Sequence, residues 1–212
     1  MVAKINKAVI PVAGLGTRML PATKAIPKEL LPVYDRPIIE HVVREAIAGG
    51  VTEIILVTRS GKEAIENHFD ANYELEHRLD KKGKIKILGT VKNIIPEHVK
   101  VTSIRQSDAL GLGHAVLCAK HLLNDEPFAV LLPDVLVLDK ELHEKDYSFT
   151  ELVKAWERTE VGQIMVERVD SEMIENYGIA DLGGIKSEPF VSVPIKGLVE
   201  KPRTADAPSN LA

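Results

Sequence analysis

The sequence predicts an α/β protein in which a parallel sheet is flanked by helices. Apolar runs of strand length alternate with amphipathic stretches, and the first three elements follow the order strand, helix, strand, which implies a right-handed βαβ unit. Glycine-rich or polar segments follow several of the apolar runs, as is typical where ligands bind outside the carboxyl ends of parallel strands. At 212 residues and without an internal repeat, the chain is expected to form one domain over 1–212.

The first elements are predicted from apolar runs and helix-boundary residues. Residues 8–13 form a short apolar run that predicts a buried strand. A helix is expected to begin with Pro37 in its first turn and to end at Gly49 and Gly50. Residues 53–58 are rich in β-branched and apolar side chains, as expected for a strand buried on both faces.

The next stretch predicts a long helix, a turn, a strand and a further helix. The helix is expected over about 62–79, followed by a charged turn at 80–86 and a strand at 99–104. A helix over 115–123 follows the glycine-containing segment 111–114. The inward positions of these two helices are expected to be Ile65, Phe69, Tyr73, Leu75 and Cys118.

The remaining elements are a strand, a helix and two later strands. Residues 128–132 are the most apolar run and predict a central strand. A helix over 148–159 carries a capping-box pattern, with Ser148 as the N-cap and Glu151 three residues later. Residues 163–169 and 191–199 predict two more strands.

Composition excludes several classes of partner. The net charge of −4 provides no basic field, so neither nucleic acid nor an anionic membrane is an expected partner. No apolar run approaches membrane-spanning length, and the N-terminal apolar patch is too short and too interrupted for a signal peptide. The single cysteine is compatible with the reducing cytoplasm, where we expect the protein to act.

The loop after the first predicted strand has the residues of a phosphate site. Gly14 and Gly16 allow backbone N–H groups to approach an anion closely, and Arg18 and Lys28 add positive charge. The dinucleotide fingerprint fails because Met19 stands where a third glycine is needed. A P-loop also fails, because Gly61-Lys62 is followed by glutamate. An ordinary glycine-rich turn with solvated cations remains the alternative.

Further polar residues follow later strands. Asp134 ends the most apolar run, where a carboxylate needs a cation or hydrogen bonds, so it is either a Mg²⁺ ligand or a turn cap. The carbonyl and amide of Gln106 can pair with uracil or thymine, although a Gln in a turn is an equally good interpretation. Glu200 and Lys201 follow the last predicted strand and either contact a sugar phosphate or lie exposed.

In combination, these segments resemble the sugar-1-phosphate nucleotidyltransferases, and within them the bacterial enzymes that act on UTP and glucose 1-phosphate. The resemblance rests on residues 8–46, 53–58, 65–70, 105–120, 131–135, 163–167, 177–179 and 199–212. It implies a Rossmann-like, mixed but mostly parallel sheet of the nucleotide-diphospho-sugar transferase type. Family members continue past residue 212, so the resemblance implies that a C-terminal part is missing, and that the complete chain is a homo-oligomer.

The resemblance also implies a role for each candidate site residue. Arg18, Lys28, Asp134 and Lys201 form the catalytic set: Arg18 and Lys28 bind the triphosphate, Asp134 binds Mg²⁺ and Lys201 binds the sugar phosphate. Gly178 and Glu200 contact glucose. The nucleotide-binding set is Ala13, Gly14, Gly16, Thr17, Glu29, Gln106 and Gly111.

The reaction that this resemblance implies joins two anions, because an oxygen of glucose 1-phosphate attacks the α-phosphorus of UTP and pyrophosphate leaves. The protein would act mainly by positioning and charge neutralisation, assisted by Mg²⁺. Two alternatives stay open. One is another pyrimidine sugar nucleotidyltransferase that uses dTTP, and the other is a non-catalytic module that binds a nucleotide sugar.

Overall fold

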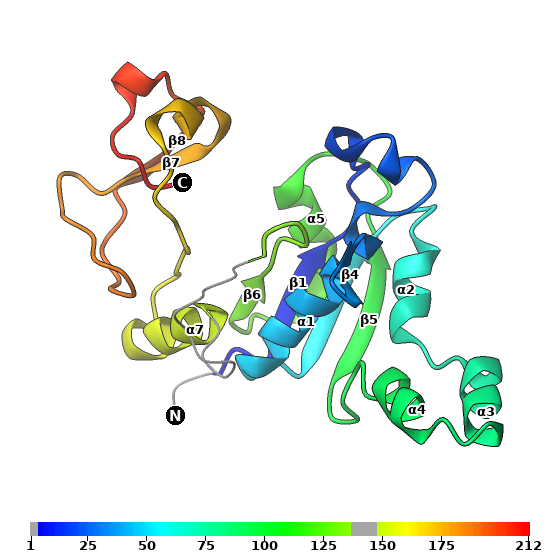
Figure 1. The fold of residues 1–212 in the computed structure, drawn as a ribbon. Helices are drawn as coiled ribbons and strands as arrows, with labels where there is room; N and C mark the ends of the chain where they lie inside the picture. The colour runs from blue at the N-terminus through cyan, green and yellow to red at the C-terminus, as the bar shows by residue number, and fades with distance from the viewer. Residues whose placement is uncertain (1–3, 137–147) are drawn as a thin grey trace. The chain divides into compact units, whose positions relative to one another are not determined.

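The structure is a computed structural model that describes residues 4–136 and 148–212 and contains two compact units (Figure 1). Unit 1 covers Met1–Thr150 and unit 2 covers Glu151–Ala212. The expectation of a single domain over 1–212 stays a prediction. Within the described ranges, no helix combines the length and the apolar character needed to cross a membrane.

Among the described residues, unit 1 is built on a parallel sheet of four strands, in the order β5-β4-β1-β6. These strands are β1 (Lys7–Pro11), β4 (Glu53–Thr58), β5 (Lys100–Arg105) and β6 (Phe128–Val130). All three pairings between neighbouring strands are parallel. The α/β fold with a mostly parallel sheet is therefore confirmed, and the carboxyl ends of these strands lie at one edge of the sheet.

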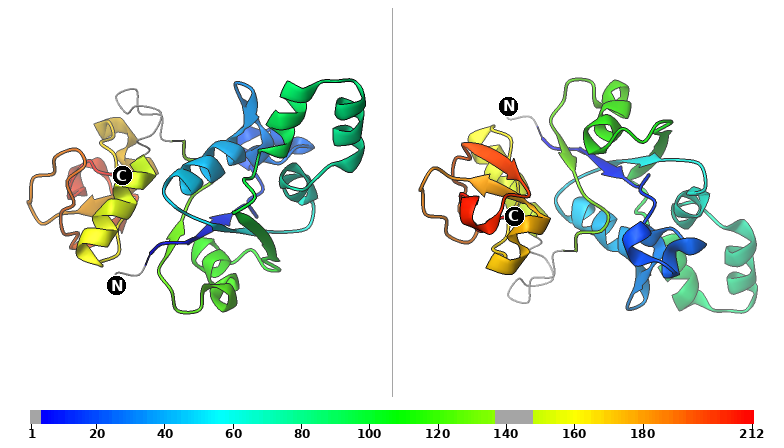
Figure 2. Two further views of the ribbon diagram at one scale, coloured as in Figure 1. Left: turned by 90° about the horizontal axis from the view of Figure 1, so that it is seen from below. Right: turned by 90° about the horizontal axis from the view of Figure 1, so that it is seen from above.

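Helices cover both faces of this sheet (Figure 2). The helix α1 (Ile38–Ala48) buries one apolar face, which includes Ile39, Val42, Val43 and Ala46. On the other face, α5 (Leu112–Cys118) and α6 (Lys120–Leu123) pack Ala115, Ala119 and Leu123 against Val9, Ile55 and Val57. Each fully buried aliphatic side chain contributes about 1.5–3 kcal/mol, so this core fixes the strands that carry the loops of the site.

The start of α1 differs from the prediction. Pro37 lies immediately before the helix, with an extended ψ of 148°, and is not in its first turn. It belongs to the short antiparallel pair of β2 (Pro32–Val33) and β3 (Arg36–Pro37), which holds it extended.

The long helix predicted over 62–79 is two helices, α2 (Glu63–Phe69) and α3 (Tyr73–Lys81). The break has a local cause: the Asn72 side chain accepts a hydrogen bond from the backbone N–H of Leu75 at 3.0 Å and so caps a new helix. Tyr73 and Leu75 are exposed, so the prediction that they point inward was wrong.

Two other helical predictions also need correction. Part of the predicted charged turn belongs to α4 (Ile85–Lys92), whose Ile85 and Ile87 are exposed. The helix predicted over 115–123 starts earlier and is divided into α5 and α6 at Ala119. Cys118 is half-buried and packs against the core cluster.

The predicted central strand at 128–132 is shorter and lies at the end of the sheet order. It is β6, which in the described part of the chain pairs with β1 on one side. Ala129 is buried, whereas Phe128 and Val130 are about two-fifths exposed. The prediction was wrong because an apolar run reports hydrophobicity and says nothing of the order in which strands pair.

Unit 2 contains most of α7 (Ser148–Thr159) and an antiparallel pair, β7 (Gly178–Asp181) with β8 (Gly197–Glu200). The bounds of α7 match the prediction, while the side chain of Ser148 lies outside the described part of the chain, so its cap stays a prediction. The strand predicted over 163–169 was wrong in its extent: pairing is confined to an isolated bridge between Arg168 and Leu211, which is flanked by backbone hydrogen bonds from Glu167 and Val169 to the last residues of the sequence. The strand predicted over 191–199 begins only at Gly197, because 191–196 has no paired partner strand in the described sheet.

Short 3-10 helices complete the described elements. They are η1 (Thr17–Met19), η2 (Ala22–Lys24), η3 (Lys28–Leu30), η4 (Ser171–Asn176) and η5 (Thr204–Asp206).

Candidate active site

The candidate site of unit 1 lies at the carboxyl edge of the sheet. The glycine loop follows β1, Gln106 follows β5 and Asp134 follows the strand β6 and its short extension. Backbone hydrogen bonds continue past the strands, from the N–H of Gln106 to the carbonyl of Thr58 at 2.8 Å and from the N–H of Leu131 to that of Val9 at 3.1 Å. The core therefore directs these loops to one side of the unit.

Lys28 and Asp134 meet across this edge. The Lys28 Nζ donates to Asp134 Oδ2 at 2.6 Å, although the two residues are 106 positions apart. Lys28 belongs to η3, in the segment after β1, and its side chain lies beside Gly14: a Cβ on Gly14 would be 3.6 Å from Lys28 Cε. The structure thus brings together three residues that the sequence selected: a glycine, a cation and a carboxylate.

Gly16 is required by the shape of the loop. Its φ of 69° is left-handed, and a Cβ there would lie 3.2 Å from Lys28 Cβ and 3.3 Å from Thr23. The Thr23 hydroxyl donates to the Gly16 carbonyl at 2.7 Å and holds the turn. Thr17 and Arg18 follow in η1 with exposed side chains. Within the described ranges, Arg18 has no ion-pair partner, so its guanidinium remains available to an anion.

Glu29, the neighbour of Lys28, is buried in an ion pair that was not expected. The Lys62 Nζ donates to Glu29 Oε2 at 2.7 Å, and the two side chains are 8% and 0% exposed. The other oxygen, Glu29 Oε1, is buried without a hydrogen-bond partner. In the sequence, Lys62 stands in a failed P-loop pattern and at the start of a predicted helix; its place after the strand 53–58 was the signal that it reaches the same edge.

Gln106 is buried and held by its own loop. Its Nε2 lies 3.1 Å from the Gly111 carbonyl, to which it donates, and 3.1 Å from His114 Nδ1. Gly111 has a φ of 94°, which favours glycine. Gln106 and Gly111 are therefore joined by a hydrogen bond, and His114 is a contact that sequence reasoning missed. The remaining member of that set, Ala13, is half-buried directly after β1.

Unit 2 brings its own three candidates together. Gly178 and Glu200 are paired across β7 and β8, and a Cβ on Gly178 would be 3.3 Å from Glu200 Oε2. Lys201 follows with a φ of 45°, its N–H donates to the Tyr177 carbonyl at 3.0 Å, and its Nζ lies 3.8 Å from Glu200 Oε1. A glycine, an acid and a base thus share the end of one hairpin.

The donors for a metal ion are sparse. Among the residues that the structure describes, no group of three or more His, Cys, Asp or Glu side chains is arranged to hold an ion. Asp134 offers a single carboxylate that is 43% exposed. This donor set fits Mg²⁺, which commonly binds through one or two carboxylates together with substrate phosphates and water.

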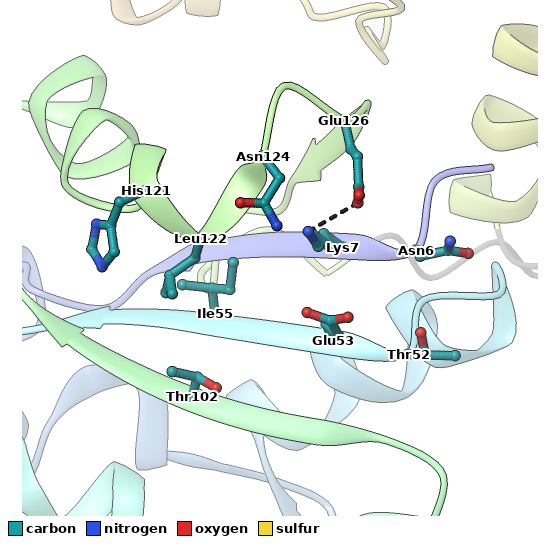
Figure 3. Close-up of a pocket in the computed structure, with 10 residues that line it drawn as sticks. All are labelled: Asn6, Lys7, Thr52, Glu53, Ile55, Thr102, His121, Leu122, Asn124 and Glu126. Carbon is teal, nitrogen blue, oxygen red and sulfur yellow. Dashed lines mark ion pairs between the residues drawn. The ribbon is translucent and has the colours of Figure 1, made fainter. Parts of the chain in front are cut away.

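A hollow of about 490 Å³ lies at the opposite edge of the sheet, near the amino ends of β1 and β4 (Figure 3). Lys7 and Glu126 form an ion pair of 2.9 Å there. The lining is mostly polar and contains none of the predicted site residues: Asn6, Lys7, Thr52, Glu53, Ile55, Thr102, His121, Leu122, Asn124 and Glu126. The hollow is therefore separate from the carboxyl-edge site.

Comparison with protein families assigns residues 7–212 to one family, described as nucleotidyl transferase. The chain belongs to the nucleotidyl transferase family. The resemblance inferred from the motifs is thereby confirmed, and its order of segments was sufficient to identify the family.

Several members of the nucleotidyl transferase family are close relatives. The UTP–glucose-1-phosphate uridylyltransferase of Escherichia coli (strain K12) is 53% identical over 209 residues, which are 99% of this chain and 68% of the relative. The UDP-glucose pyrophosphorylase from Acinetobacter baumannii is 50% identical with a TM-score of 0.93, and the match covers 98% of this chain and 72% of that one. A UTP-bound structure of that enzyme gives the same values.

Proposed function

We propose that the chain transfers a uridylyl group from UTP to glucose 1-phosphate. A phosphate oxygen of glucose 1-phosphate attacks the α-phosphorus of UTP, the bond from that phosphorus to the bridging oxygen breaks, and pyrophosphate leaves. The products are UDP-glucose and pyrophosphate. The names of the relatives support the substrates, and the carboxyl-edge geometry supports the chemistry.

The observation that carries the proposal is the 2.6 Å ion pair between Lys28 and Asp134 beside Gly14. It places a cation, a carboxylate and a glycine backbone at the sheet edge where α/β proteins bind ligands. Lys28 would bind the triphosphate together with Arg18, whose exposed guanidinium offers a fork matched to phosphate oxygens. These cations would stabilise the charge that develops on pyrophosphate as it leaves.

The nucleoside would lie along the same edge. Gln106 and Gly111 would contact the uracil, because the carboxamide and the backbone beside it can match the donor and acceptors of that base. Ala13, Gly14, Gly16 and Thr17 would line the segment between base and phosphates. Glu29 would lie near the nucleoside.

The glucose 1-phosphate would bind to the hairpin of unit 2. Glu200 would accept hydrogen bonds from sugar hydroxyls, and Gly178 would leave room for the ring beside that carboxylate. Lys201 would bind the phosphate, because its ammonium is half-exposed and lies 3.8 Å from the Glu200 carboxylate that would hold the sugar. These roles join the three residues that the hairpin gathers.

Mg²⁺ is the proposed cofactor, and Asp134 is its proposed protein ligand. A bound magnesium ion neutralises phosphate charge and helps to orient the α-phosphate. Lys28 would pair with the triphosphate in place of Asp134, and the Asp134 carboxylate would then be free to bind the metal. We further propose that the enzyme acts in the cytoplasm, in keeping with its single cysteine, and that the complete chain is a homo-oligomer.

The test is pyrophosphate release by the chain with UTP, glucose 1-phosphate and Mg²⁺. Turnover with UTP well above that with dTTP supports the proposal, whereas preference for dTTP makes the chain a thymidylyltransferase. Binding of UDP-glucose without any pyrophosphate release would instead identify a non-catalytic nucleotide-sugar module. Adding Mg²⁺ to metal-free protein should restore turnover, and equal turnover in a chelator would remove the metal from the scheme.

A further inference from the structure

We infer that Lys62 is a positioning residue for nucleotide binding: it holds the Glu29 carboxylate so that one oxygen is kept for a hydrogen-bond donor of the nucleotide. The inference rests on the proposed function and adds a residue to it. Lys62 need not touch the nucleotide itself, because its Nζ bonds Glu29 Oε2 at 2.7 Å.

The place of the pair in the fold supports this role. Glu29 directly follows Lys28, whose side chain reaches Asp134, and Lys62 lies just beyond the end of β4. The last residue of β4, Thr58, accepts the backbone hydrogen bond of Gln106. The Glu29–Lys62 pair therefore joins the segment that carries the candidate phosphate cation to the strand next to the candidate base contact.

The chemistry of the carboxylate supports it further. Lys62 satisfies one oxygen of Glu29, and the other is buried without a partner. An unsatisfied buried acceptor costs free energy, and a donor from the nucleotide, such as a ribose hydroxyl or a base N–H, would remove that cost.

The charge of Lys62 is essential to this arrangement. Glu29 is fully buried, and a buried carboxylate that loses its partner is strongly destabilised where it stands. Without Lys62, the Glu29 carboxylate would no longer be held in place, and its unpaired acceptor would be lost to the nucleotide. Substitution of Lys62 should therefore act on nucleotide affinity through Glu29.

Steady-state kinetics on the full chain test this with Lys62→Met, Glu29→Gln and the double variant. Lys62→Met should raise KM for UTP about tenfold or more, as expected for a lost hydrogen bond to a charged group. Its kcat and its KM for glucose 1-phosphate should stay within about twofold. The double variant should have the same KM for UTP as Glu29→Gln, because Lys62 acts only through Glu29.

Lys7→Met is the matched control, since it removes another buried lysine from an ion pair, at the amino edge of the same sheet. It should lower stability and leave KM for UTP unchanged. The inference is overturned if Lys62→Met keeps the wild-type KM for UTP, or if its kcat falls as much as its KM rises. It is also overturned if the effects of Lys62→Met and Glu29→Gln on KM multiply in the double variant. Should Lys62→Met not fold, the double variant against Glu29→Gln decides, because a neutral buried pair is tolerated. Failure of the proposed function would show separately, as wild-type protein without turnover.

Discussion

The two edges of the parallel sheet each carry a lysine paired with a carboxylate and differ in the residues around that pair. At the amino edge, Lys7 pairs with Glu126 beside the hollow of about 490 Å³. At the carboxyl edge, Lys28 pairs with Asp134, while Arg18 has no ion-pair partner among the described residues and one oxygen of Glu29 has no donor. The comparison teaches that a buried lysine in an ion pair does not by itself distinguish the two edges, whereas the glycine loop beside Lys28 is found only at the carboxyl edge of the described sheet.

The largest effect that would test this contrast is expected for Asp134→Ala. Turnover should fall by about 10²-fold or more, which is typical when one preorganised electrostatic element is lost. The matched variant at the amino edge, Glu126→Ala, also removes a carboxylate from a lysine and should keep its kcat within about twofold. Pyrophosphate release measures both, and equal losses would mean that the two edges do not differ in function.

A smaller effect is expected for Gly16→Ala. The left-handed backbone costs about 1–2 kcal/mol for a residue with a Cβ, and this Cβ would also crowd Lys28 and Thr23. We expect kcat/KM for UTP to fall about tenfold, because Lys28 is displaced. Gly50→Ala is the control: its φ is also positive, at 96°, and its Cβ would meet nothing within 4 Å. A similar loss of activity in both variants would trace the effect to general instability.

Thr23→Val should have a modest effect confined to the same loop. It removes the 2.7 Å hydrogen bond from Thr23 Oγ1 to the Gly16 carbonyl and keeps the shape of the side chain. The free energy of unfolding should fall by about 0.5–1.5 kcal/mol, with a rise of a few-fold in KM for UTP. Denaturant unfolding and steady-state kinetics measure the two quantities. An unchanged KM would show that this hydrogen bond does not set the loop for the nucleotide.

The smallest effect concerns a carboxylate away from both edges. Burial raises the pKa of Glu45 on α1, whose Oε1 accepts the backbone N–H of Phe149 at 3.3 Å, a bond that lowers the pKa by less. Because the folded state disfavours the ionised form, this group destabilises folding above its raised pKa, and the cost disappears as the pH falls below the ordinary value of about 4.3.

Glu45→Gln should therefore raise Tm at about pH 7, by roughly 2 °C, and the gain should vanish at about pH 4. Thermal unfolding at the two pH values measures the change, and turnover should stay at the wild-type level. A gain in Tm that did not depend on pH would contradict the assignment to ionisation.

The parts of the fold that were predictable from sequence are those where local pattern and burial agree. Residues 53–58 form a strand with the predicted bounds because every position carries an apolar or β-branched side chain except the first. The prediction of one continuous helix over 62–79 was wrong because one side-chain cap, at Asn72, outweighs the helical spacing of the residues around it. The predicted central position of β6 in the sheet was wrong because strand order depends on pairings that no single segment encodes.

The candidate site was predictable as a set of strand-end residues and unpredictable in its contacts. Lys28 and Asp134 were both selected, and parallel topology places both at one edge, yet only the structure shows the hydrogen bond between them. Lys62 and His114 were not selected as site residues. Lys62 pairs with Glu29, which is distant in sequence, and His114 contacts Gln106 without a motif that would single it out. A rule that every buried charge needs a partner would have prompted a search for Lys62 as the partner of Glu29.

One consequence follows from the order of two adjacent residues. Lys28 and Glu29 stand side by side in a single short turn, and they connect in opposite directions, to the segment after β6 and to the segment after β4. These strands flank β1 on its two sides, so the turn bridges three neighbouring strand ends through alternating charges. Exchanging the two residues would keep composition and net charge, but like charges would then face each other on both sides, so the sheet edge depends on sequence order as well as on content.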